Sequence, residues 1–163
     1  MATPSQVIIE PYRNFRFLVE IDGFASAGFN KASGLKQATD VIEYREGGEN
    51  STVRKLPGQT KFDPVMLERG ATSSTDFLDW VQKIHKYGGT PGLYITRKTI
   101  TIVIIGNEGK RLKEYVLQNC WPSEWEQGEL DARASDVLIE RVTIQHEGIL
   151  LAGTPQPDNL ITT

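Results

Sequence analysis

The sequence has little of what metal sites and disulfide frameworks need. Its 163 residues include one cysteine, Cys120, and two histidines, His85 and His146. One cysteine forms no intramolecular disulfide, so the fold does not depend on an oxidising compartment. Two distant histidines and a cysteine do not supply the closely spaced ligands of a zinc site, and we expect no metal and no cofactor. We expect Cys120 to be a small core residue, because no basic side chain stands near it in sequence.

Long apolar runs and a basic leader are also missing. No window of about 18 consecutive apolar residues exists, which excludes a membrane-spanning helix and any membrane insertion through one. Met1–Glu10 lacks the basic start and apolar centre of a signal peptide. We therefore expect folding in the cytoplasm and no classical export signal.

Signatures of catalysis are equally scarce. No serine lies in a G-x-S-x-G motif, and nucleophilic hydrolysis needs a histidine base. Gly106–Lys110 is a poor phosphate loop, because its glycines are too close together and no Ser or Thr follows the lysine. Acidic residues between Glu124 and Asp131 fit a solvated strand better than the paired acids of a glycosidase. Trp121 and Trp125 are more typical of an interface than of a sugar site. We expect no enzyme.

What is present is the composition of one globular domain. Apolar residues make up 39% of the chain and charged residues 24%, with a net charge of −3. A chain of this length buries roughly two thirds of its unfolded surface, which is enough for one core. The small, mixed charge gives no field that would attract nucleic acid.

Alternating and β-branched segments predict a mainly β domain. In the segment 14–21, Phe15, Phe17, Val19 and Ile21 fall on one side. Pro64 inside the segment 60–67 indicates an edge or bulged strand. We expect strands at 14–21, 37–45, 60–67, 99–105, 111–118 and 137–148, with a short strand around Phe29 and a short extended piece at 124–130.

One helix is expected at 74–87. Phe77, Trp80, Val81 and Ile84 follow the i, i+3, i+4, i+7 spacing of a stripe that docks on a sheet. Serines precede the segment and Gly88 follows it, as helix caps do. The predicted fold class is therefore a β-sandwich or barrel of six to eight strands with one flanking α-helix at about 74–87.

Two features indicate assembly without proving it. The segment 46–58, with three glycines and a proline, reads as a long loop or a protruding hairpin. In the last strand Leu138, Val142 and Ile144 form one face. Arg141, Thr143, Gln145 and Glu147 form the other. A monomeric sandwich and a multi-subunit barrel would both show such a wet face, so periodicity leaves the two open.

Several motifs, in order along the chain, resemble the inner tail-tube protein family of contractile phages and phage-tail-like contractile injection systems. The resemblance spans roughly Tyr12 to Gly148. It is carried by Ala32–Leu35, Val41–Gly48, Arg54–Gly58, Leu67–Gly70, Asp76–Trp80, Asn119–Trp125 and Ile139–Gly148.

The resemblance implies six copies per ring, rings stacked into a hollow tube, and strands from all subunits lining one lumen. The long loop would then contact the neighbouring ring through Glu46, Gly47, Gly48, Glu49, Asn50, Val53, Arg54, Lys55 and Leu56. Arg141, Thr143, Gln145 and Glu147 are the candidates for the lumen face.

The resemblance also implies partners and boundaries. The subunit would bind itself, a sheath protein, baseplate or tube-initiator and spike proteins, a terminator or cap, and cargo in the lumen, within a particle assembled in the cytoplasm. We expect an N-terminal lead at 1–11, one tube domain at 12–151 and a loose tail at 152–163. The alternatives are a secreted hexameric ring that carries effector proteins in its pore and a monomeric β-barrel enzyme or ligand binder.

Overall fold

The computed structural model describes residues 16–22, 28–48, 52–87, 97–106, 108–133 and 135–152. Predictions that concern Phe15, Glu49, Asn50, Gly88 and the tail after Ala152 lie outside these residues. The described residues form nine strands and one helix: β1 (Phe17–Ile21), β2 (Lys31–Ser33), β3 (Gln37–Tyr44), β4 (Arg54–Phe62), β5 (Val65–Gly70), α1 (Asp76–Tyr87), β6 (Lys98–Ile105), β7 (Arg111–Gln127), β8 (Ile139–Gln145) and β9 (Gly148–Ala152).

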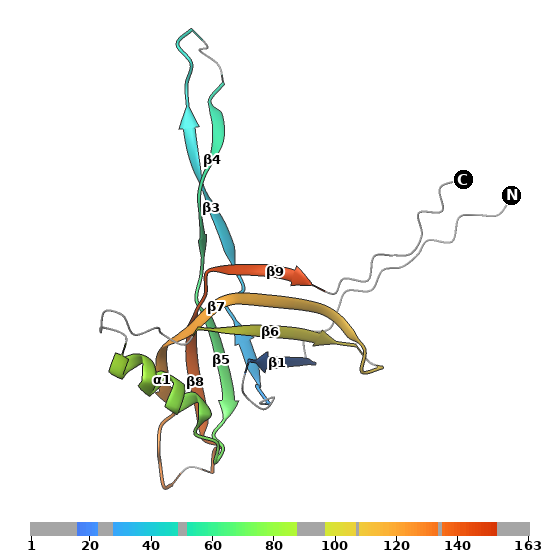
Figure 1. The fold of residues 1–163 in the computed structure, drawn as a ribbon, viewed down its shortest axis with the longest axis vertical. Helices are drawn as coiled ribbons and strands as arrows, with labels where there is room; N and C mark the ends of the chain where they lie inside the picture. Colours follow the sequence, from blue (N-terminus) through green and yellow to red (C-terminus); the bar gives the residue numbers. More distant parts are fainter. Residues whose placement is uncertain are drawn as a thin grey trace, which may run out of the picture.

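Seven strands form one antiparallel sheet in the order β1-β6-β7-β8-β5-β2, with β9 also paired to β7. The long strand β7 belongs to two layers. Its first part pairs with β6 and β9, and Trp121–Gln127 pairs with β8. In Figure 1, β6, β7 and β9 run across the view while β5 and β8 run nearly vertically, so the sheet folds over into a sandwich.

The core lies between these layers and uses alternate residues of each strand. In β5 and β8 every second side chain is buried, which is the period-2 pattern of a strand with one wet face. Leu67 and Ile144 from one layer are fully buried in the same cluster as Ile100 and Leu117 from the other. Burial of each such side chain contributes about 1.5–3 kcal/mol.

The predicted helix is confirmed as α1. Asp76 and Asp79 lie in its first turn, and His85 and Lys86 lie in its last turn. Charges at these ends interact favourably with the helix dipole and stabilise the helix. Phe77 and Trp80 are buried, and the Phe77 ring meets Phe29 edge to face with centroids 5.5 Å apart. Within the described part of the chain, no helix has the length and apolarity to cross a membrane.

Three strand predictions were wrong in detail. The segment 60–67 is not one strand, because β4 ends at Phe62 and β5 begins at Val65, and β5 is no edge since it pairs with β2 and β8. Proline lacks the N–H that a ladder needs, and Pro64 lies in the break. Conversely, β7 runs on through Pro122, where a bulge accommodates the ring, to Gln127.

The last predicted strand, 137–148, is two strands. β8 ends at Gln145 and β9, which we did not expect, begins at Gly148. With these differences and the three-residue strand β2, the described residues contain nine strands. The mainly β class with one flanking helix is confirmed.

Candidate assembly surfaces

β3 and β4 form a separate two-stranded hairpin that projects from the body of the protein (Figure 1). We call this hairpin, residues 37–62, the arm. Every residue of β3 is exposed, and in β4 only Gly58 and Phe62 are half-buried. The predicted loop at 46–58 is therefore partly strand, since β4 begins at Arg54.

The arm is a direct continuation of the β2–β5 pair. Ser33 lies opposite Met66 and Gln37 lies opposite Phe62, so both pairs keep one register. This continuation is possible because a glycine stands where the two chain segments pass close to each other, between β2 and β3 on one side and β4 and β5 on the other. Gly34 has φ +92°, and a Cβ there would lie 2.2 Å from the carbonyl oxygen of Pro64.

Polar contacts fasten the root of the arm to the sandwich. The Asp63 N–H donates to the Lys36 carbonyl at 3.2 Å, and the two side chains form an ion pair at 3.3 Å. A ring nitrogen of buried His146, Nε2, lies 2.9 Å from the Asp63 carbonyl oxygen. The arm therefore leaves the body in a defined direction.

The arm itself has no core. Val41, Ile42, Tyr44 and Leu56 are 63%, 53%, 50% and 48% exposed. Ile42 lies opposite Leu56 on the paired strand. An isolated two-stranded hairpin is marginally stable in water, and apolar side chains gathered on an exposed element mark an interaction surface. The arm therefore offers apolar side chains that a partner could bury.

The polar residues predicted for the loop lie around these apolar side chains. Arg54 is paired across the hairpin with Tyr44, and Lys55 with Glu43. Arg54 also forms an ion pair with Glu46 at 4.0 Å. Val53, Gly47 and Gly48 lie in the turn, where Gly48 has φ +112°. Their role in contact between subunits stays a prediction.

The second surface is the outer face of β2, β5, β8 and the end of β7. Four charged side chains stand in one row across these strands, in strict register: Lys31, Glu68, Arg141 and Glu126. Successive ion pairs measure 3.3, 3.0 and 2.9 Å. We call these four residues the charge row. The hydrogen bond from Arg141 is the main reason that the pKa of Glu68 lies below its ordinary 4.5.

The candidates for the lumen face do not all lie on this surface in the same way. Arg141, Thr143 and Gln145 follow one another on the partly exposed face of β8. Glu147 lies beyond the end of β8, where it pairs with Arg97 and accepts a hydrogen bond from Asn119 at 2.9 Å. These contacts lower the pKa of Glu147, with the bond from Asn119 as the largest cause.

A buried ion pair, which the sequence did not reveal, lies behind this second surface, on the core side of β5 and β8. Arg69 Nε donates to Glu140 at 2.7 Å, and the two side chains are 5% and 10% exposed. Trp125 Nε1 also donates to Glu140, at 2.6 Å, and the Arg69 guanidinium lies 4.6 Å from the Phe77 ring centre. Both charged residues lie on the buried faces of their strands, β5 and β8.

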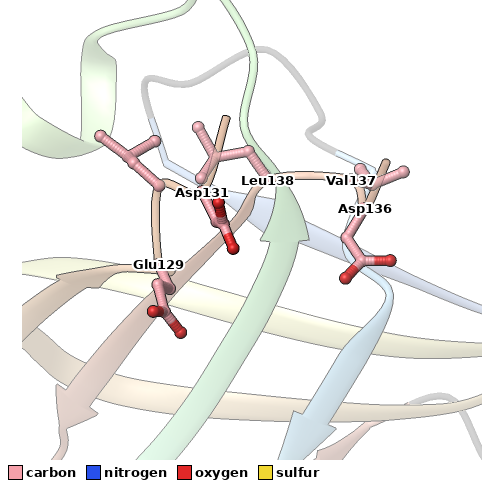
Figure 2. A pocket seen from close by; sticks show the side chains of 6 residues that line it. Glu129, Asp131, Asp136, Val137 and Leu138 are labelled. Atoms are coloured by element: carbon pink, nitrogen blue, oxygen red, sulfur yellow. The ribbon is translucent and has the colours of Figure 1, made fainter. Parts of the chain in front are cut away.

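The loop between β7 and β8 encloses an open pocket of about 290 Å³. Figure 2 shows that Glu129 and Asp131 come from one end of this loop and Asp136 from the other. Its lining has three carboxylates and no basic group. Among the residues with described positions, no set of three or more His, Cys, Asp or Glu side chains is arranged to hold a metal ion.

Cys120 lies at the bend of β7, where the two layers meet. It is fully buried, and desolvation raises the pKa of its thiol to about 12. Its Sγ contacts the Leu117 carbonyl at 3.3 Å. The thiol therefore stays protonated near neutral pH, which is the opposite of a reactive cysteine.

A sandwich with a coreless arm and a charge row on its outer face is typical of a subunit that assembles with other chains. The chain belongs to the T4-like virus tail tube protein gp19 family, whose model matches residues 13–150. It is thus a structural tail-tube protein, as the resemblance implied.

Several solved structures are similar in fold to this chain. A chain of the extracellular contractile injection system PVC, in its extended sheath-tube complex, is 26% identical with a TM-score of 0.74, and the match covers 93% of this chain and 98% of that one. A chain of the 6-fold symmetrised anti-feeding prophage baseplate gives TM-score 0.77 at 23% identity, over 91% and 100% of the two chains. Hcp1 from Flavobacterium johnsoniae shares the fold, with TM-score 0.52, 16% identity and coverage of 84% and 94%. Among curated proteins, none matches this chain.

Proposed function

We propose that this protein is the repeating subunit of the inner tube of a phage-tail-like contractile particle. Six copies form a ring, and rings stack into a hollow conduit for DNA or protein cargo. The observation that carries the proposal is the arm, whose apolar residues Val41, Ile42 and Leu56 are 63%, 53% and 48% exposed. Family membership and the match to a PVC sheath-tube complex support it.

The arm is the contact between rings in this proposal. It extends along the longest axis of the subunit and leaves the body from a fixed root (Figure 1). A neighbouring ring would cover Ile42 and Leu56, while Arg54 and Lys55 would meet acidic groups at its rim. Such exposed pairs contribute little each, but a tube repeats them many times.

The wall of the conduit is the outer face of β2, β5, β8 and the end of β7. Arg141, Thr143 and Gln145 face the lumen, and Glu147 lies at its margin. Alternating charges keep this face hydrated yet nearly neutral, so cargo of either sign meets no strong field. The role is passive and not enzymatic.

The partners follow from the position in the particle. We infer a sheath around the tube, a baseplate with initiator and spike at one end, and a terminator or cap at the other; PVC sheath-tube and anti-feeding prophage cap structures contain chains of this fold. Assembly takes place in the cytoplasm, and the particle acts outside the cell that made it. The tube domain occupies 12–151, between the lead 1–11 and the tail 152–163.

The test removes the tip of the arm. Deletion of 46–50 should leave a folded subunit that forms rings but no long tubes, because the body does not depend on the tip. Negative-stain electron microscopy measures tube length, and circular dichroism checks the fold. Replacement of Glu108 and Lys110 by alanines, in the exposed β6–β7 turn, is the control and should leave tubes of normal length. Normal tubes from the deletion variant would refute the role of the arm. Rings as the sole product of the wild-type protein would favour the ring carrier.

A further inference from the structure

We infer that the charge row continues across the joint between neighbouring subunits, where Lys31 of one copy pairs with Glu126 of the next. The inference rests on the proposed ring and adds the residues that select which edges join. It starts from the two outer strands of the wall. β2 pairs with β5 alone, and Trp121–Gln127 of β7 pairs with β8 alone, among the residues that the structure describes.

These two strands present free edges on opposite sides of the wall. A free edge exposes unpaired backbone N–H and C=O groups and is a template for another strand. Because the wall has four antiparallel strands, β2 and the end of β7 run in opposite directions. When β2 of one copy meets β7 of a copy related by rotation about the ring axis, the new pair is also antiparallel. The antiparallel alternation of strands then continues around the ring.

The row ends in opposite charges at these two edges. Its order is positive, negative, positive, negative, from Lys31 on β2 to Glu126 on β7. Lys31 and Glu126 each have one ion-pair partner inside the subunit, and their side chains remain 60% and 55% exposed. An ammonium has three donors and a carboxylate accepts several hydrogen bonds, so each has capacity for a second partner.

The same charges oppose the wrong joints. Two β2 edges would bring Lys31 beside Lys31, and two β7 edges would bring Glu126 beside Glu126. Like charges directly opposite each other destabilise a strand pair. The row therefore favours head-to-tail joining, which closes into rings, over two-fold dimers that would block both edges.

Charge reversal tested in mixtures separates this pairing from an effect on folding. In Lys31→Glu alone, every joint places two carboxylates together, and in Glu126→Lys alone every joint places two ammonium groups together. We expect each variant alone to give about tenfold fewer rings and tubes than wild type. In an equimolar mixture, alternation of the two variants makes every joint attractive again, and an even-numbered ring closes. Assembly should return to near the wild-type level.

Two controls define the site. In a mixture of Lys31→Glu with Glu124→Lys, which is changed two positions along the same strand, Glu124→Lys should form rings by itself. Lys31→Glu should be largely excluded from them, because any ring that contains it has at least one joint between two carboxylates. Lys110→Glu, in the exposed β6–β7 turn, should assemble normally by itself. Thermal unfolding reports whether each variant is folded, and Lys31→Gln with Glu126→Gln replaces the reversals if these unfold. The neutral pair should still assemble several-fold less than wild type.

The results distinguish the inference from the proposed function. Rings and tubes from wild type, loss in each reversal and rescue in the mixture support the pairing. Normal assembly by either reversal alone, failure of the mixture when both variants are folded, or entry of Lys31→Glu into rings with Glu124→Lys would overturn it. If wild type forms neither rings nor tubes in electron micrographs, the proposed function itself fails.

Discussion

The arm and the sandwich body contain similar strand-forming residues, yet they bury them in opposite ways. β5 alternates buried and partly exposed side chains, and Val65 and Leu67 are fully buried. β3 has Val41 and Ile42 side by side, and both are more than half exposed. The residues of β3 favour an extended backbone, but no second layer stands over it. Burial depends on what packs against a strand.

The difference shows which part of the molecule buries its apolar side chains and pairs its buried charges without another chain. The body closes its core with two layers and α1, and it satisfies its buried charges internally. Phe62 at the root of the arm lies against His146 of the body, with ring centroids 5.6 Å apart. Farther along, the arm has cross-strand contacts such as the hydroxyl pair of Thr39 and Thr60 at 3.0 Å and the ion pair of Lys61 and Asp40 at 2.8 Å. Changes in the body should therefore affect folding, and changes in the arm should affect assembly.

The largest effect on folding is expected from Glu140→Ala. It leaves the Arg69 guanidinium buried without its carboxylate and removes the acceptor of Trp125 Nε1. We expect a loss of about 3–5 kcal/mol in the free energy of unfolding, measured by urea titration. The control Glu108→Ala breaks a pair of similar length, 2.8 Å, that is about three-quarters exposed, and should cost less than about 1 kcal/mol. Equal effects would mean that burial does not matter here.

A smaller loss is expected from Gly34→Ala, at the junction of arm and body. The new methyl group would meet the Pro64 carbonyl oxygen, and the positive φ disfavours any side chain. We expect at least about 2 kcal/mol of destabilisation by thermal unfolding. Gly47→Ala, in the tip with open space around it, is the matched control and should change little. An unchanged melting temperature for Gly34→Ala would show that the root rearranges freely.

Acid should weaken the charge row. Because the pKa of Glu68 is lowered in the folded state, its contribution to stability is present above the unfolded value of 4.5 and is lost as pH falls through the folded value. The melting temperature should therefore drop below about pH 5, with a smaller drop in Glu68→Gln. Differential scanning calorimetry from neutral to acid pH measures this, and identical curves for both proteins would contradict it.

The smallest effect on folding is expected in the arm. Ile42→Ser with Leu56→Ser should change the free energy of unfolding by no more than about 0.5 kcal/mol, because neither side chain is buried in the subunit. The same variant should lose long tubes in electron micrographs. Leu150→Ser, 51% exposed on β9, is the matched control and should keep them. A strongly destabilised double variant would show that the arm supports the body.

Most of the element types could be predicted, and most errors concern where strands end. α1 was predictable because Phe77, Trp80 and Ile84 repeat at helical spacing between capping residues. Pro64 misled because it breaks a continuous ribbon at the root of the arm, whereas Pro122 lies at a bulge that lets β7 continue. β9 was missed because Leu150 and Leu151 are both about half exposed, so the segment has no period-2 pattern.

The surfaces were predictable only in part. The wet face of β8 follows from alternation, since Arg141 and Thr143 fall opposite Val142 and Ile144. The charge row does not, because its members are far apart in sequence and meet only through the register of four strands. The same reason hid the buried pair of Arg69 and Glu140.

The sequence by itself determined a mainly β domain with one helix, a protruding segment before β5, and a residue inventory without a metal or nucleophile site. Local periodicity and turn chemistry carry that information, because they act between near neighbours. The tertiary structure alone decided that this segment is a coreless arm continuous with β2 and β5, and that opposite charges end the wall at its two free edges. Those properties depend on strand register and on which layers face each other, and both are set by contacts between residues distant in the chain.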